Sequence, residues 1–157
     1  ASWPKVIQPD TITDSIGWVG DILPTCLELA GTTYPETFRG VKTSPPEGRS
    51  VVPVLKGQEI APPEYLFSND KGQQGVLFKG RWKLLIEPGW YPITSKVPDI
   101  QYELYDLEKD PAEKTNVAQQ NPELVQQLTA ACEKWQSKCN IIDYGEFLKI
   151  LKESKIE

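Results

Sequence analysis

The sequence has no histidine and no methionine among its 157 residues. Without histidine there is no imidazole base that titrates near pH 7, and no imidazole ligand for a metal ion. The lack of methionine predicts a chain that was processed, truncated or cut from a longer protein. The three cysteines, Cys26, Cys132 and Cys139, are an odd number, which excludes a complete set of disulfides within the chain.

Two further absences limit the possible partners. Seventeen basic residues face 22 acidic ones, for a net charge of −5, and this argues against a nucleic-acid partner. No apolar run reaches the roughly 20 residues of a membrane span. Cys132 and Cys139 would lie about 10 Å apart on one helix, too far for a disulfide, so we expect free and partly buried thiols.

What is present is typical of a soluble globular domain, with 39% hydrophobic and 25% charged residues. Residues 20–31 predict a short helix with Asp21 as N-cap, Pro24 in the first turn and Gly31 just past the end. Its apolar side is broad and has to pack on something larger. That side consists of Ile22, Leu23, Cys26, Leu27 and Ala30. Residues 32–63 read as an irregular, proline-rich connector with one helical turn near residues 51–55.

Residues 64–106 predict four antiparallel strands, which are rich in aromatic and aliphatic residues and bounded by Gly, Asp and Pro. Gly80-Arg81 is expected to form a tight hairpin turn. Residues 88–99 read as a long hairpin loop that carries Trp90 and Tyr91. Residues 116–138 predict a helix with Asn121 as N-cap and Pro122 at the first position.

The apolar face of this second helix repeats with helical spacing and would cover one side of the sheet. It consists of Leu124, Leu128, Ala131, Cys132 and Trp135. Asp143 and Glu146 then predict a capped helical tail. The fold class expected is α+β, with a small antiparallel sheet packed by a C-terminal helix. The predicted parts are residues 1–31, the connector 32–63, the α+β subdomain 64–140 and the tail 141–157.

Four pieces in this order resemble the C-terminal region of type I sulfatases, the arylsulfatases of the alkaline-phosphatase-like superfamily, over about residues 2–136. They are Trp3-Pro4 with Asp21-Ile22-Leu23-Pro24-Thr25 and Leu27–Gly31; Glu47-Gly48-Arg49-Ser50 with Pro53–Gly57; Lys79-Gly80-Arg81-Trp82-Lys83-Leu84; and Glu103–Leu107 with Asp110-Pro111-Ala112-Glu113 and Asn116. The resemblance implies that residues 1–31 are the end of an α/β catalytic domain.

The resemblance also implies chemistry that cannot be placed here. Family members use calcium and a formylglycine made from Cys or Ser in a C/S-x-P-x-R motif, with His and Lys residues that bind and protonate the sulfate ester. None of the cysteines is followed by that pattern. Ser44-Pro45-Pro46-Glu47-Gly48-Arg49 comes close, but its Arg stands one position late. We therefore expect no catalytic residue and no metal ligand in this chain.

The resemblance places a strand turn beside the substrate cleft. The residues there that could bind sugar hydroxyls or sulfate are Asn69, Lys71, Gln73 and Gln74, with Trp90 as a stacking surface. An ordinary polar turn, or packing of Trp90 within its loop, is the alternative. Likewise, the basic group Lys79, Arg81 and Lys83 could be a solvated face or an anion site, and Asp106, Asp110 and Glu113 could be turn residues or metal ligands.

The function expected is that of a C-terminal fragment of a sulfuric ester hydrolase. The parent would act on sulfated aryl or glycan substrates, and the fragment would support the fold and the cleft without the reaction. A phosphate or phosphonate ester hydrolase, or a stand-alone binding module, is the alternative. The resemblance suggests a secreted or periplasmic protein.

Overall fold

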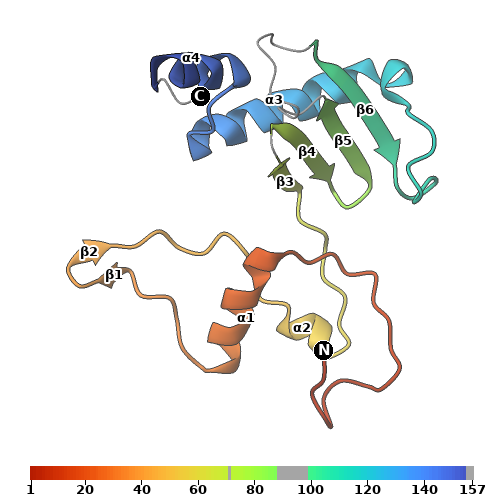
Figure 1. The fold of residues 1–157 in the computed structure, drawn as a ribbon. Helices are drawn as coiled ribbons and strands as arrows, with labels where there is room; N and C mark the ends of the chain where they lie inside the picture. Colours follow the sequence, from red (N-terminus) through yellow and green to blue (C-terminus); the bar gives the residue numbers. More distant parts are fainter. Residues whose placement is uncertain (71, 88–98, 155–157) are drawn as a thin grey trace. The chain divides into compact units, whose positions relative to one another are not determined.

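The computed structural model describes residues 1–70, 72–87 and 99–154. The chain divides into two compact units, unit 1 at Ala1–Pro62 and unit 2 at Pro63–Glu157 (Figure 1). In the described ranges, no helix has the length and apolar character that a bilayer span requires. Each unit is described by itself below.

Unit 2 contains the predicted sheet of four antiparallel strands, in the order β3-β4-β5-β6. The strands are β3 (Tyr65–Asp70), β4 (Gln73–Phe78), β5 (Trp82–Glu87) and β6 (Gln101–Asp106). The two-residue turn predicted at Gly80-Arg81 is wrong by one residue. Phe78 pairs with Trp82, so the turn also includes Lys79, and Lys79 and Gly80 have φ angles of 50° and 71°.

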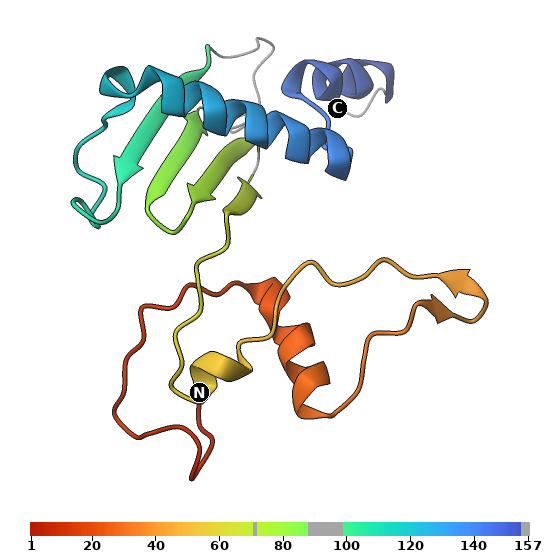
Figure 2. The same cartoon turned by 180° about the vertical axis from the view of Figure 1, so that it is seen from behind.

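The predicted second helix is α3 (Pro122–Cys139), which lies across one face of the sheet in both views (Figures 1 and 2). Pro122 occupies its first turn, where a missing N–H breaks no helical hydrogen bond. Asn121 is the N-cap of α3, as predicted, but its side chain makes no cap hydrogen bond, and its amide donates instead to the carbonyl of Val117 at 2.9 Å. Asn140, in the left-handed conformation, ends the helix.

The core of unit 2 lies between this helix and the sheet. Side chains alternate between the two faces of a strand, so every second residue of the sheet faces α3. The apolar residues of α3 recur with helical spacing and face the sheet. The buried residues of this core are Val76, Leu84, Ile86, Leu104, Leu128 and Cys132. At the β3 side, Phe67 stacks on Trp135 with ring centroids 5.1 Å apart. Each buried Leu contributes about 1.5–3 kcal/mol by leaving water.

The outer edge of β6 is covered by the chain that follows it. The Leu104 N–H donates to Oδ1 of Asn116 at 3.1 Å, and Nδ2 of Asn116 donates to the carbonyl of Tyr102 at 3.1 Å. The Val117 N–H donates to the carbonyl of Leu104 at 2.9 Å. These bonds occupy backbone groups that an edge strand otherwise offers to another chain. A one-turn helix, η2 (Ala118–Gln120), then leads into α3.

The predicted helical tail is α4 (Tyr144–Ser154), and its start is capped as expected. Oδ1 of Asp143 accepts a hydrogen bond from the Glu146 N–H at 2.9 Å. This bond satisfies one of the amides that have no partner inside the first turn of a helix.

Unit 1 contains little regular structure. Its helices are η1 (Val19–Asp21), α1 (Ile22–Leu29) and α2 (Val52–Leu55), the last being the helical turn expected in the connector. Gly31, with φ of 64°, ends α1 as predicted. The amides of Gly31 and Thr32 donate to the carbonyls of Glu28 and Leu27, which is the Schellman arrangement.

The sequence analysis missed a small hairpin in the connector. Strands β1 (Thr37–Phe38) and β2 (Val41–Lys42) pair across a two-residue turn. Arg39 and Gly40 form that turn with φ angles of 50° and 80°. The signal was the short alternating pattern on either side of a glycine, which is typical of such hairpins.

Candidate functional site

Two of the sulfatase-like motifs, the first through Asp21 and the second through Arg49, meet at the carboxylate of Asp21, a residue that is only 4% exposed. Oδ2 of Asp21 accepts the Trp18 N–H at 3.1 Å, and Oδ1 accepts the Arg49 N–H at 2.9 Å. Asp21 is the N-cap of α1, as predicted, but its side chain makes no cap hydrogen bond to the helix. It holds the segment before α1 and the segment before α2 together instead.

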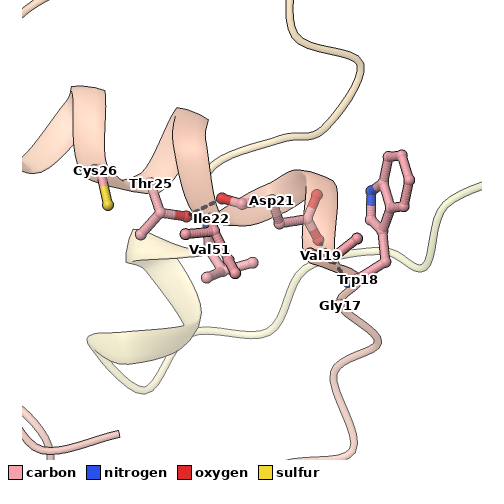
Figure 3. Close-up of a pocket in the computed structure, with 8 residues that line it drawn as sticks. All are labelled: Gly17, Trp18, Val19, Asp21, Ile22, Thr25, Cys26 and Val51. Carbon is pink, nitrogen blue, oxygen red and sulfur yellow. Dashed lines mark hydrogen bonds between the residues drawn. The ribbon is translucent and has the colours of Figure 1, made fainter.

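Thr25, one turn further along α1, makes a second link between the same segments. Its hydroxyl donates to the carbonyl of Asp21 at 2.6 Å and accepts the Val51 N–H at 3.0 Å (Figure 3). Between these links, a Cβ on Gly48 would lie 2.0 Å from the carbonyl oxygen of Gly20, so only glycine fits there. The first and second motifs thus bind each other through backbone groups.

A cavity of about 460 Å³ opens beside this junction. Figure 3 shows the side chains around it, which come from the segment before α1, from α1 itself and from the start of α2. The apolar ones are Trp18, Val19, Ile22, Cys26 and Val51. The polar groups of Asp21 and Thr25 are already engaged with the backbone, so the cavity offers mainly apolar contact.

The charged groups of the third and fourth motifs pair with each other in unit 2. Nε and Nη2 of Arg81 donate to the two carboxylate oxygens of Asp106 at 2.9 and 2.8 Å. This hydrogen bond lowers the pKa of Asp106 below its usual value. Nζ of Lys83 lies 2.7 Å from both carboxylate oxygens of Glu113.

The contacts of these side chains within unit 2 are as follows. Of the predicted basic group, Arg81 and Lys83 form ion pairs with motif carboxylates, so their charge is balanced within the unit. Oδ2 of Asp110 accepts the Thr115 N–H at 2.8 Å, which is turn chemistry. Among the residues that the structure describes, no cluster of three or more His, Cys, Asp or Glu side chains could hold a metal ion.

The predicted sugar-binding residues lie at the end of the β3–β4 hairpin. Asn69 pairs with Gln74, and its Oδ1 accepts the Gly72 N–H at 3.2 Å. The Sγ of Cys132 donates to Oε1 of Gln74 at 3.4 Å, so the Gln74 side chain lies on the α3 side of the sheet. Gln73 belongs to the opposite face, because side chains alternate along a strand. The roles of these three residues stay predictions.

Two of the predicted contacts, Lys71 and Trp90, lie outside the described residues. The sequence brought these five together as neighbours of one cleft. The structure adds that Asn69 and Gln74 share one face of the hairpin, from which Gln73 is directed away.

The thiols are all free, as expected: Cys26 and Cys139 are exposed and Cys132 is buried. Burial raises the pKa of the Cys132 thiol to about 11, so it stays protonated at neutral pH. A protonated thiol is a poor nucleophile and a poor metal ligand. Cys132 therefore has the properties of a core residue.

Comparison with known proteins identifies relatives of this chain, although no family model matches it. The ulvan-active sulfatase of Formosa agariphila is 29% identical over 152 residues, which cover 78% of this chain and 28% of that protein. The N-acetylgalactosamine-6-O-sulfatase of Bacteroides thetaiotaomicron is 28% identical over 148 residues, covering 87% and 26%. This chain thus spans about a quarter of the length of these curated relatives.

A solved structure supports the same relationship. It comes from work on the metabolism of multiple glycosaminoglycans by Bacteroides thetaiotaomicron and is 28% identical, with a TM-score of 0.55. The similarity covers 74% of this chain and 24% of that one. The matched parts lie at the C-terminal end of the relatives. An uncharacterized sulfatase of Schizosaccharomyces pombe is 33% identical over 134 residues, which cover 80% of this chain and 22% of that protein. The chain belongs to the sulfatase family, and it corresponds to the C-terminal region of its members.

Proposed function

We propose that this chain is the C-terminal part of a sulfuric ester hydrolase, and that it completes the fold of a catalytic domain without carrying the reaction itself. The observation that carries the proposal is the inverted burial of α1. Its buried residue is the polar Thr25, whereas three of its large apolar residues are exposed. Ile22, Leu23 and Leu29 are 62%, 45% and 49% exposed, and Val19, in η1 just before α1, is 75% exposed.

An apolar helix face of this kind is expected to be covered by another protein surface. The cavity beside Ile22 and Val51 strengthens this point, because it would accept an apolar side chain from the domain that docks there. A stand-alone module would cover the apolar side of α1 within its own chain. The described contacts of unit 1 instead hold α1 by its polar side, through Asp21 and Thr25.

The proposal assigns no reaction step to this chain. Five polar motif residues make hydrogen bonds within their own unit: Asp21 and Thr25 in unit 1, and Arg81, Lys83 and Asn116 in unit 2. A catalytic domain would supply the calcium ion and the formylglycine, and with them the nucleophile. By the same proposal, sulfated aryl or glycan compounds are substrates of the complete enzyme.

Two measurements test the proposal. Turnover of 4-nitrophenyl sulfate by the 157-residue chain alone should be absent, and measurable turnover would contradict the assignment. Binding of an apolar fluorescent dye should be clear for the wild type and reduced in the double variant Val19→Ser/Ile22→Ser. Ile150→Ser, at a 46% exposed position in α4, is the matched control and should leave dye binding nearly unchanged. Equal dye binding in all three proteins would contradict the docking surface.

A further inference from the structure

A groove of about 790 Å³ lies between α3 and the β6 edge, wholly within unit 2. Its volume falls in the usual range for small-ligand sites, about 300–1,000 Å³. The residues on which the argument depends come from β6, η2 and α3. They are Tyr102, Gln119, Val125, Gln126, Thr129 and Glu133.

The groove combines amide groups with one aromatic ring and an apolar wall. The side chains of Gln119 and Gln126 make no hydrogen bond to any described residue, so their donors and acceptors are available to a ligand. Tyr102 is 36% exposed, and Val125 adds apolar surface beside it. A pyranose ring matches this set, because it offers hydroxyl groups at its rim and a C–H-rich face for the aromatic ring.

The charge of the groove selects against a sulfate group. Among the described residues that line it, Glu133 is the only charged one, and it is acidic. The motif cations Arg81 and Lys83 are paired with carboxylates and do not line the groove. An anionic sugar would therefore meet a negative charge without a compensating cation.

The β6 edge beside the groove is not open to an added peptide strand. Asn116 and Val117 already bond the carbonyl of Tyr102 and both backbone groups of Leu104. Strand addition draws its affinity from such main-chain groups, so a ligand here has to rely on side chains. This favours a sugar over an extended peptide.

We propose that the groove between α3 and β6 binds an uncharged sugar unit, such as an unsulfated residue of a glycan chain. The inference does not depend on the docking surface on α1, because the groove lies within unit 2. It assigns the chain a binding activity of its own, in addition to the structural role proposed above.

The test is a titration of the ¹⁵N-labelled full chain with N-acetylgalactosamine, and separately with its 6-sulfate, followed by NMR. N-acetylgalactosamine offers hydroxyls and an acetamide to the glutamine amides. We expect saturable shifts of the Tyr102, Gln126 and Thr129 amides, and no tighter binding of the 6-sulfate. No saturable shift in the groove, or tighter binding of the 6-sulfate there, would overturn the proposal.

Variants locate the binding. Tyr102→Ala should weaken it at least about fivefold, and Tyr102→Phe should retain it, because the ring is what stacks. Gln126→Leu, at an exposed position of α3, tests the amide without touching the sheet. Gln136→Leu, on α3 outside the groove, is its control. Equal affinity of Gln126→Leu, Gln136→Leu and wild type would contradict the role of the amide. The aryl sulfate assay reports on the other proposal and is read separately.

Discussion

The two units of this chain are stabilised in different ways. Unit 2 has a continuous apolar core between α3 and the sheet, with Leu84, Leu104, Leu128 and Cys132 fully buried. Unit 1 has one buried apolar side chain, Val52. Its other buried residues, Asp21 and Thr25, are polar and bond to backbone groups.

This difference shows how a region can be specifically shaped without a core of its own. Hydrogen bonds from Asp21 and Thr25 fix the course of the chain, but each contributes only about 1 kcal/mol net. Burial of apolar surface supplies most of the stability of a domain. Unit 1 has left its apolar residues in solvent, so we expect it to gain most of its stability from a partner surface.

The largest loss of stability is expected from a substitution in the core of unit 2. Leu128→Ala removes a fully buried side chain and leaves a cavity, and should destabilise unit 2 by about 2–5 kcal/mol. Urea unfolding followed by circular dichroism measures the loss. Leu29→Ala, at the 49% exposed end of α1, is the control and should cost less than about 0.5 kcal/mol. Similar losses in the two variants would contradict the contrast between the units.

The second prediction breaks the polar junction of unit 1. Asp21→Ala removes the acceptor of two backbone N–H groups and should cost about 1–3 kcal/mol locally. Hydrogen exchange should become faster at the amides of Trp18 and Arg49 and stay unchanged in unit 2. Asp14→Ala, at an exposed position, is the control. Unchanged exchange at Trp18 and Arg49 would argue against this junction.

The third prediction concerns acid. The Arg81 hydrogen bond lowers the pKa of Asp106, so the folded state favours the ionised carboxylate. The stability from this pair is therefore full above the ordinary Asp pKa of about 4, and is lost as pH falls through the lowered value. Acid unfolding of unit 2, followed by circular dichroism, should show this loss. In Asp106→Asn that part of the pH dependence should disappear; an unchanged acid transition would contradict it.

The last prediction concerns the reaction rates of the three thiols, and it involves the smallest expected change in stability. Cys26 and Cys139 are exposed and should react quickly with an aromatic disulfide reagent at pH 8. Cys132 is buried with its pKa raised to about 11, and should react only when unit 2 opens. Cys132→Ala should remove the slow phase alone. Reaction of all three thiols at one rate would contradict the buried core.

Much of unit 2 was predictable, because its core repeats in the sequence. The apolar residues of α3, including Leu128 and Cys132, have helical spacing. Val76 and Leu84 belong to strands in which every second residue is directed to the core. The turn after β4 was predicted one residue too short, because Lys79 belongs to it and has a positive φ. A lysine gives no sign of this in the sequence, since residues other than glycine rarely adopt a positive φ. Asp21 and Asn121 are the N-caps that the sequence predicted, but their side chains bond other backbone groups, because the neighbouring segments decide which group lies within reach.

The candidate site was less predictable than the fold. The order of the motifs was enough to recognise the sulfatase family, and the lack of histidine was visible at once. That Arg81 pairs with Asp106 and Lys83 with Glu113 was not visible, because the partners lie 25 and 30 residues apart. Local periodicity carries no information on such pairs, and a paired basic residue cannot be told from an unpaired one in the sequence.

The sequence by itself determined the family, the α+β class and the element types, because these depend on local patterns and on motif order. Only the tertiary structure decided what the motif residues do. It placed Asp21 and Thr25 in backbone contacts, turned the apolar side of α1 to solvent, and opened a groove with Glu133 as its only described charge. The physical reason is that pairing, exposure and shape depend on which distant segments meet, and the chain settles that only when it folds.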